Sequence, residues 1–406
     1  MSDAEATRAS DSPFPVIFLK AQQHRRIQKG HLWIYSNEVD TARSPLKQLS
    51  AGAVARFCSH SGQGLGLGFV NPQSLICGRI LTRDQKATID SQWLETALRA
   101  ALSLRERLYS EPYYRLVHGE ADYLPGLVID RYGDVVVVQW SAAGFDTLRD
   151  ALVSAIERVV NPVGIVIKND GGVRELEQLA AEVTTLGEVP AELTVIENGC
   201  RFAVPSTGGQ KTGWFFDHRE NRARFAQLAR GLRVLDVFCY AGGWGVQAAM
   251  AGAASAVCVD SAAPALAEVH TNAERNGVAD RVSTRRGRAV EVLKAMAEAG
   301  ERFDAIAVDP PAFIKRRKDQ AAGEAAYRHV TDLALALLAP GGVLMSASCS
   351  MPLGEDGLRD IVTASLAKVG RRGQLFARGG QAADHPVHPS IPETNYLKAL
   401  FFRVLD

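Results

Sequence analysis

Short apolar runs alternate with helix-like stretches in the second half of the chain. Four of these runs predict β-strands, at residues 234–238, 256–260, 303–308 and 341–348, and the alanine-rich stretch 244–250 predicts a helix between the first two. This alternation is typical of a doubly wound α/β sheet, in which the carboxyl ends of parallel strands meet at a ligand-binding edge. We therefore expect four side chains near these strand ends to surround one pocket: Asp236, Asp260, Asp309 and Cys349.

Residues 232–260 have the features of a unit that binds an adenosine-bearing cofactor. Gly242 and Gly243 allow the backbone to approach a ligand closely, and the following helix offers its N-terminal amides. Asp236 can orient this loop. Asp260 follows the glycines by about 20 residues, where dinucleotide-binding folds place the acid that holds a ribose. A glycine turn alone would equally suit the start of an ordinary helix. The polar residues at the other strand ends decide in favour of a ligand pocket.

The first half of the chain has a different pattern. Residues 14–83 contain short strands interrupted by glycines, which predicts a small β-rich module. Residues 84–187 mix helix-like stretches at 90–109 and 146–160 with strands at 127–130, 135–140 and 164–168, which predicts an α+β unit. Nothing in this central unit gathers a nucleophile, a base and an acceptor, so we assign it no chemistry.

Several motifs resemble those of a known family. "DVFCYAGGWG" (236–245), "VDPPAF" (308–313) and "SASCS" (346–350) are similar to three motifs of the class I S-adenosylmethionine-dependent RNA methyltransferases. "GHLWIYSNEV" (30–39) resembles the N-terminal PUA RNA-binding domain of the bacterial 23S ribosomal RNA cytosine-5 methyltransferases, and "GEADYLPGLVIDRYGD" (119–134) resembles their central domain. "KTGWFFDHRENR" and "HPVHPSIPETNYLK" match this family too.

The resemblance implies a domain order and a cofactor. A disordered tail (1–13) would precede a PUA domain (14–83), a central α+β domain (84–187) and a Rossmann-like class I methyltransferase domain (188–406). The expected cofactor is S-adenosylmethionine, and the residues expected to contact it are Asp236, Phe238, Tyr240, Gly242, Asp260 and Arg219. Phe238 and Tyr240 stand where the commoner motif has glycines. Arg288 stands where many relatives carry an acid that contacts the adenine.

Cys349 is the candidate nucleophile because it follows an apolar strand and has a serine on each side. A cysteine is more often a small buried hydrophobe, and we expect this of Cys239 and Cys258. The resemblance implies that a Cys349 thiolate adds to carbon 6 of cytosine, so that carbon 5 can take the methyl group. A free thiol has a pKa of about 8.5, so a neighbouring group must favour the thiolate. The resemblance gives Asp309 two roles, to hold the base and to assist proton transfer.

Two alternatives to cytosine methylation stay open. The first arises at the fourth motif: many RNA cytosine-5 methyltransferases carry a second cysteine directly after its proline, but here Pro310 is followed by Pro311. Asp-Pro-Pro followed by an aromatic also resembles enzymes that methylate purine nitrogen, in which Phe313 would clamp a flat base without a thiol. The third hypothesis is a non-catalytic RNA-binding or ribosome-assembly factor.

RNA contacts are expected at two basic segments. Arg25, Arg26 and Lys29 lie in "KAQQHRRIQKGH" near two aromatic residues, a combination that suits RNA, although a solvated helix face is the alternative. A second basic segment follows the Asp309 motif at Lys315, Arg316 and Arg317. The expected partner is ribosomal RNA that presents a single-stranded or flipped cytosine. The resemblance also suggests a homodimer.

Composition narrows the class of protein without identifying it. The net charge of the 406-residue chain is only +1, so an RNA surface must come from local clustering. The six cysteines are scattered without a CxxC pair, which predicts neither a metal site nor a disulfide framework and favours a reducing cytoplasm. No apolar run approaches the roughly 20 residues of a membrane span, and we expect no membrane partner.

Overall fold

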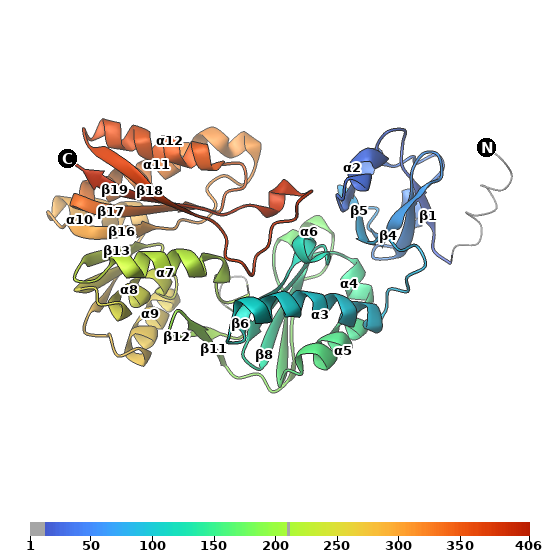
Figure 1. The fold of residues 1–406 in the computed structure, drawn as a ribbon, viewed down its shortest axis with the longest axis horizontal. Helices are drawn as coiled ribbons and strands as arrows, with labels where there is room; N and C mark the ends of the chain where they lie inside the picture. The colour runs from blue at the N-terminus through green and yellow to red at the C-terminus, as the bar shows by residue number, and fades with distance from the viewer. Residues whose placement is uncertain (1–12, 209–211) are drawn as a thin grey trace. The chain divides into compact units, whose positions relative to one another are not determined.

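The predicted strands and helices form three larger sheets and one two-stranded ladder in this computed structural model, which describes residues 13–208 and 212–406 (Figure 1). The tail predicted at 1–13 lies outside the described residues except for Pro13. Among the described residues, no helix combines the length and the apolar character that a membrane crossing requires. The sheets lie at residues 16–82, 113–187 and 233–405, each within one of the predicted domain ranges.

The first sheet has the strand order β1-β3-β4-β5-β2. Its elements are β1 (Val16–Phe18), β2 (Trp33–Tyr35), β3 (Val54–Cys58), β4 (Gly64–Val70) and β5 (Ile76–Thr82), with the short helix α2 (His24–Gln28) before β2. Inward-facing side chains such as Ile17, Ile34 and Phe57 form its core. The β-rich module predicted from the glycine-interrupted strands is therefore present.

The second sheet has the order β10-β9-β8-β7-β6 and is mostly antiparallel. Its strands are β6 (Tyr113–His118), β7 (Leu127–Tyr132), β8 (Val135–Trp140), β9 (Gly164–Asn169) and β10 (Glu182–Gly187). The helices of this region are α3 (Ser91–Leu108), α4 (Gly144–Thr147), α5 (Arg149–Val160) and α6 (Val173–Leu176). The apolar positions of α3 and α5 pack on the sheet, as in the predicted α+β unit.

The third sheet has the order β15-β14-β13-β16-β17-β19-β18. Five parallel strands form most of it: β13 (Arg233–Val237), β14 (Ser255–Asp260), β15 (Val282–Arg286), β16 (Phe303–Val308) and β17 (Leu338–Ser348). β19 (Lys398–Leu405) inserts antiparallel between β17 and β18 (Arg372–Gly379). The predicted Rossmann-like architecture is confirmed, and the structure adds an antiparallel edge formed by β19 and β18.

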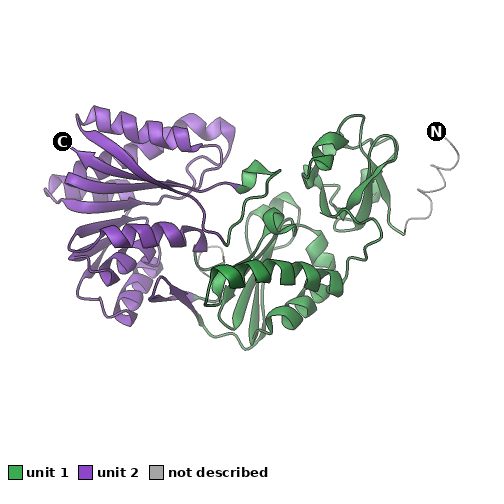
Figure 2. Cartoon of the chain, viewed as in Figure 1, with its two compact units in different colours: residues 1–193, 205–214, 384–394 green, residues 194–204, 215–383, 395–406 purple. Residues whose placement is uncertain are grey.

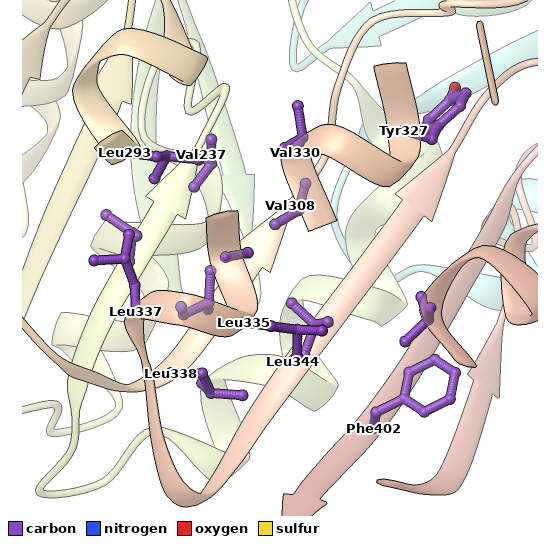
Figure 3. Close-up of a cluster of buried hydrophobic side chains, with 14 of the residues drawn as sticks. Val237, Leu293, Val308, Tyr327, Val330, Leu335, Leu337, Leu338, Leu344 and Phe402 are labelled. Atoms are coloured by element: carbon purple, nitrogen blue, oxygen red, sulfur yellow. The ribbon is translucent and has the colours of Figure 1, made fainter. Parts of the chain in front are cut away.

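Helices cover both faces of this third sheet (Figure 1). One group comprises α7 (Arg219–Leu228), α8 (Gly243–Met250) and α9 (Ala263–Arg275), and the other comprises α10 (Ala289–Glu298), α11 (Gln320–Leu337) and α12 (Glu355–Lys368). The core between the sheet and the second group contains Val237, Val308, Leu344 and Phe402 from the strands and Tyr327 from α11 (Figure 3). The central strands are continuously apolar because helices cover both faces of this sheet.

The chain divides into two compact units that do not follow the sequence order strictly (Figure 2). The first contains residues 1–193, 205–214 and 384–394, and the second contains 194–204, 215–383 and 395–406. The ladder of β11 (Glu192–Glu197) and β12 (Cys200–Pro205) contributes to both. Polar contacts hold segments 205–214 and 384–394 to the rest of the first unit. The buried Arg105 donates to the carbonyl of Asp384 at 2.8 Å, and Tyr132 donates to the carbonyl of Thr212 at 3.0 Å.

Candidate functional site

The carboxyl ends of β13, β14, β16 and β17 lie at one edge of the third sheet. β13 pairs in parallel with β14 and β16, and β16 pairs in parallel with β17. Asp236 lies in β13, Asp260 ends β14, Asp309 directly follows β16 and Cys349 directly follows β17. The structure therefore brings the four predicted strand-end residues to the same edge, as parallel pairing requires.

The loop after β13 has an unusual backbone. Phe238 has a φ of 66°, Tyr240 has 46° and Gly242 has 84°, so all three adopt the left-handed region that favours glycine. Phe238 and Tyr240 are the two positions at which the commoner motif has glycine. Because Phe238 leaves extended geometry, β13 ends at Val237, one residue before the predicted end of the strand.

Asp260 holds this loop by accepting backbone hydrogen bonds. Its Oδ2 accepts from the amide of Tyr240 at 3.1 Å, and its Oδ1 accepts from the amide of Ala262 at 2.9 Å. Hydrogen bonds to a charged acceptor are stronger than neutral ones, which helps to fix a backbone that Tyr240 would otherwise avoid. Asp260 is half-buried and remains available to a ligand on its cavity side.

Asp236 supports the loop from inside the domain. Its carboxyl group is fully buried and its Oδ2 accepts from the amide of Gly245 at 2.9 Å, at the start of α8. Burial raises the pKa of Asp236 to about 7, since a charged carboxylate is poorly solvated there. Asp236 therefore positions the glycine turn and does not line the cavity.

A cavity of about 390 Å³ opens beside Asp260. Phe238 and Phe313 lie on it, and their ring centroids are 6.2 Å apart in an edge-to-face arrangement. Its wall also includes Gly287, Arg288 and Val290. Flat aromatic surfaces beside a carboxylate match the chemistry of an adenine base joined to a ribose, so these residues fit an adenosine-bearing cofactor. Arg288 lies at the rim, with its side chain 83% exposed and 3.5 Å from Glu291.

Two ring N–H groups fix the carboxylate of Asp309. Nε2 of His218 lies 3.1 Å from Oδ1, and Nε1 of Trp244 donates to Oδ2 at 3.2 Å. The amide nitrogen of Asn221 faces Nδ1 of His218 at 3.2 Å, and the same nitrogen donates to the carbonyl of Gly380. We therefore assign the proton of His218 to Nε2, so that it donates to Asp309. Neither His218 nor Trp244 was predicted as a site residue, although both lie in the motifs that resemble the family.

Cys349 differs from the other five cysteines because its side chain is partly exposed, whereas theirs are buried. Burial raises the pKa of Cys77 to about 12 and that of Cys200 to about 11, which makes them unreactive. The expected burial of Cys239 and Cys258 is confirmed.

A tyrosine fixes the turn that carries Cys349. The hydroxyl of Tyr327 lies 2.9 Å from the hydroxyls of both Ser348 and Ser350. Ser350 also accepts from the amide of Ile314 at 3.0 Å, which ties this turn to the loop after Asp309. Serines on both sides of the thiol therefore determine the backbone position of Cys349.

Two family models match the sequence. One describes a PUA-like domain and matches residues 17–83, and the other describes an S-adenosylmethionine-dependent methyltransferase and matches residues 177–403. The chain belongs to the S-adenosylmethionine-dependent methyltransferases. The cofactor of this methyltransferase is S-adenosylmethionine, in agreement with the aromatic cavity beside Asp260.

Relatives match the methyltransferase along its whole length. The "Ribosomal RNA large subunit methyltransferase I" of Shewanella denitrificans is 36% identical over 394 residues, which cover 96% of this chain and 99% of that protein. The protein of the same name from Klebsiella pneumoniae strain 342 is 35% identical over 405 residues, covering 98% and 100%. A solved structure named SMU.776, a methyltransferase complexed with SAH, has a TM-score of 0.81 at 21% identity and covers 96% of this chain and 100% of that chain.

Arg219 does not lie on the cofactor cavity of the methyltransferase. Its side chain is buried at the start of α7, with Nε 3.7 Å from Oε2 of Glu197 and its guanidinium 5.4 Å from the ring of Phe216. The predicted cofactor contact of Arg219 therefore stays a prediction. Among the described residues, no cluster of His, Cys, Asp and Glu is suited to a metal ion.

The predicted RNA-contacting residues lie in both units of the methyltransferase. Arg25, Arg26 and Lys29 line a cavity of about 510 Å³ together with His31 and Ser390. Arg26 also donates to both carboxylate oxygens of Glu38 at 2.9 Å, so part of its charge is used internally. The second segment is exposed on the unit that carries Cys349 and consists of Lys315, Arg316 and Arg317.

We expect Asp260→Asn to weaken cofactor binding without unfolding the domain. An asparagine oxygen can accept from only one of the two amides that the carboxylate now holds, and its NH₂ group would face the other amide. The amide is also a weaker acceptor than the carboxylate for a ribose hydroxyl, and losing one hydrogen bond to a charged group corresponds to roughly tenfold weaker binding or more. Calorimetric titration with S-adenosylmethionine measures this change in Kd.

Asp280→Asn is the matched control, because the Asp280 side chain is 76% exposed and lies outside the cavity lining. An unchanged Kd for Asp260→Asn would contradict the assignment of this carboxylate to the cofactor site.

Proposed function

We propose that this methyltransferase forms 5-methylcytidine in 23S ribosomal RNA, in the bacterial cytoplasm, through a covalent adduct of Cys349. Three observations support the proposal: the relatives are named ribosomal RNA large subunit methyltransferase I, the N-terminal module matches a PUA-like domain, and Cys349 is the partly exposed cysteine at the ligand-binding edge. The partly exposed thiol of Cys349 is the reason for proposing methylation at carbon 5.

The proposed chemistry requires a nucleophile because carbon 5 of cytosine is otherwise too electron-poor to accept a methyl group. The Cys349 thiolate forms a bond from Sγ to carbon 6, which moves an electron pair to carbon 5. When bound, S-adenosylmethionine supplies an electrophilic methyl group, which carbon 5 takes. A base then removes the proton from carbon 5, and the electron pair of that bond expels the thiolate from carbon 6.

Asp309 would hold the cytosine in this proposal. Its side chain is 21% exposed, and its two oxygens already accept from His218 and Trp244. A carboxylate offers about four acceptor positions, so Asp309 can accept further hydrogen bonds from the exocyclic amino group of the base. Because His218 and Trp244 fix the carboxylate plane, base recognition is its first role and proton transfer its second.

The contacts of Phe313 argue against methylation of guanine nitrogen. In that alternative the aromatic residue after Asp-Pro-Pro clamps the target base. Here the Phe313 ring lies 4.8 Å from the ring of Tyr327 and lines the cavity assigned to the cofactor. The ring of Phe313 therefore packs against Tyr327 and borders the cofactor cavity, where it would meet the cofactor. Membership of the methyltransferase family argues against a purely non-catalytic RNA-binding factor.

RNA would bind at the two basic segments in this proposal. The cavity lined by Arg25, Lys29 and His31 lies in the first compact unit, and the exposed Lys315 and Arg316 lie in the second. Phosphate contacts position RNA without reading its sequence, so these side chains would orient the strand while Asp309 and Cys349 engage one unstacked cytosine.

We expect Cys349→Ala to abolish methyl transfer, because the other five thiols are buried and cannot add to carbon 6 of the cytosine. The assay uses labelled S-adenosylmethionine with unmodified 23S ribosomal RNA, followed by digestion to nucleosides. Wild-type protein should place the label in 5-methylcytidine. Cys58→Ala, which alters a buried thiol of the first sheet, should retain this activity.

Label recovered in a guanine derivative, and retained in Cys349→Ala, would overturn the proposal in favour of nitrogen methylation. Calorimetry with S-adenosylmethionine should show that Cys349→Ala still binds the cofactor, which separates loss of the nucleophile from loss of the fold.

We expect Lys29→Ala to weaken RNA binding at all sequences to a similar extent. Removing one phosphate contact should reduce the slope of log K against log salt by about 1. Filter binding of ribosomal RNA fragments at several salt concentrations measures the slope. Lys47→Ala, an exposed substitution elsewhere in the same module, should leave it unchanged, and equal slopes for the two variants would refute the assignment of Lys29.

A further inference from the structure

A buried lysine lies beside the turn that carries Cys349. Lys398 begins β19, and the antiparallel register places it directly opposite Ser348, the last residue of β17. The residue is only 8% exposed. Lysine is almost never buried to this extent unless its charge has a partner, so the position of Lys398 requires an explanation.

The contacts of Lys398 direct its amine toward the turn around Cys349. Nζ donates to the carbonyl of Ser350 at 2.7 Å and to the carbonyl of Tyr396 at 2.8 Å. An ammonium group has three N–H bonds, so these carbonyls account for two of them. Because Ser350 directly follows Cys349, its contact with Nζ places the charge of the amine next to the residue that carries the thiol, and the two groups interact electrostatically.

We propose that Lys398 is the cation that favours the thiolate form of Cys349. A positive charge beside a thiol in a partly buried environment favours the ionised sulfur. This role of Lys398 belongs to the proposed methyl transfer, and its biological purpose rests on that proposed function. The same cation would stabilise the thiolate a second time, when the bond from Sγ to carbon 6 breaks at the end of the reaction.

The protonation state of Lys398 is compatible with this role. Burial lowers the pKa of Lys398 to about 8, and the neighbouring Cys349 acts in the opposite direction. A lysine with that pKa is about nine-tenths protonated at pH 7. Formation of the thiolate would favour the ammonium further, since the two charges attract one another.

Two other titratable groups on the elements packed beside this turn, Tyr327 and Asp309, do not supply a positive charge. Burial raises the pKa of the Tyr327 phenol, which reaches the turn from α11 and is therefore neutral at pH 7. Asp309 follows the neighbouring strand β16, and a carboxylate there opposes formation of a thiolate. Lys398 would have to outweigh both the effect of that carboxylate and the burial of the sulfur.

The test measures how fast iodoacetamide alkylates Cys349 as a function of pH, in the full chain without RNA or cofactor. Mass spectrometry of the peptide that contains Cys349 reports its alkylation separately from the other cysteines. For the wild type we expect a midpoint below the pKa of about 8.5 of a free thiol. For Lys398→Met we expect the midpoint to rise by about one pH unit, with alkylation at pH 7 about 10-fold slower.

Lys368→Met is the matched control, because Lys368 is a 67% exposed lysine of the same unit. It should keep the wild-type midpoint. Lys398→Arg restores a positive charge and should return the midpoint below that of Lys398→Met, which a purely structural role of the lysine would not predict.

Two results would overturn the proposal. One is an equal midpoint in wild type and a folded Lys398→Met. The other is a wild-type midpoint at or above 8.5, which needs no variant and holds even if Lys398→Met fails to fold. Neither result bears on the methylated base, because alkylation requires no methyl transfer. Conversely, if Cys349→Ala retained methyl transfer, the proposed function would fail while the effect of Lys398 on the thiol could still be measured.

Discussion

Parallel pairing of β13 with β14 and β16, and of β16 with β17, is the constraint on which the rest of the site depends. Strands that run in the same direction end at the same edge, so residues that are distant in the chain meet there without any further device. The helices that cover both faces keep this sheet dry and fix the strand ends. Cofactor and substrate chemistry can then be divided among neighbouring strands: β13 and β14 carry Asp236 and Asp260, and β16 and β17 lead to Asp309 and Cys349.

Each of these acidic or nucleophilic groups has a different environment, and the difference assigns its role. Asp236 is fully buried against Gly245, which suits a structural group. Asp260 accepts two backbone amides and faces the aromatic cavity, which suits a cofactor ligand. Asp309 is held by two ring N–H groups and remains partly exposed, which suits recognition of a base. The sequence shows three aspartates in or directly after apolar strands, but only the packing distinguishes them.

The sequence predicted the elements whose signals are local. The apolar runs of the third sheet, the glycine turn and the position of Cys349 after a strand were all visible as short patterns. Lys398 and His218 could not be predicted in this way, although both lie in quoted motifs. Lys398 lies beside the turn of Cys349 because β19 inserts antiparallel beside β17, and His218, just before α7, meets Asp309, which follows β16. Such contacts depend on the packing of distant segments, which periodicity and composition do not encode.

The most direct test of the central claim is to trap the adduct of Cys349. Ribosomal RNA transcribed with 5-fluorocytidine carries fluorine where the proton must leave, so carbon 5 can be methylated but the bond from Sγ to carbon 6 cannot be released. With S-adenosylmethionine present, we expect a complex that survives denaturing electrophoresis and whose peptide map places the RNA on Cys349. Absence of this complex, under conditions in which the unsubstituted transcript is methylated, would contradict the covalent mechanism.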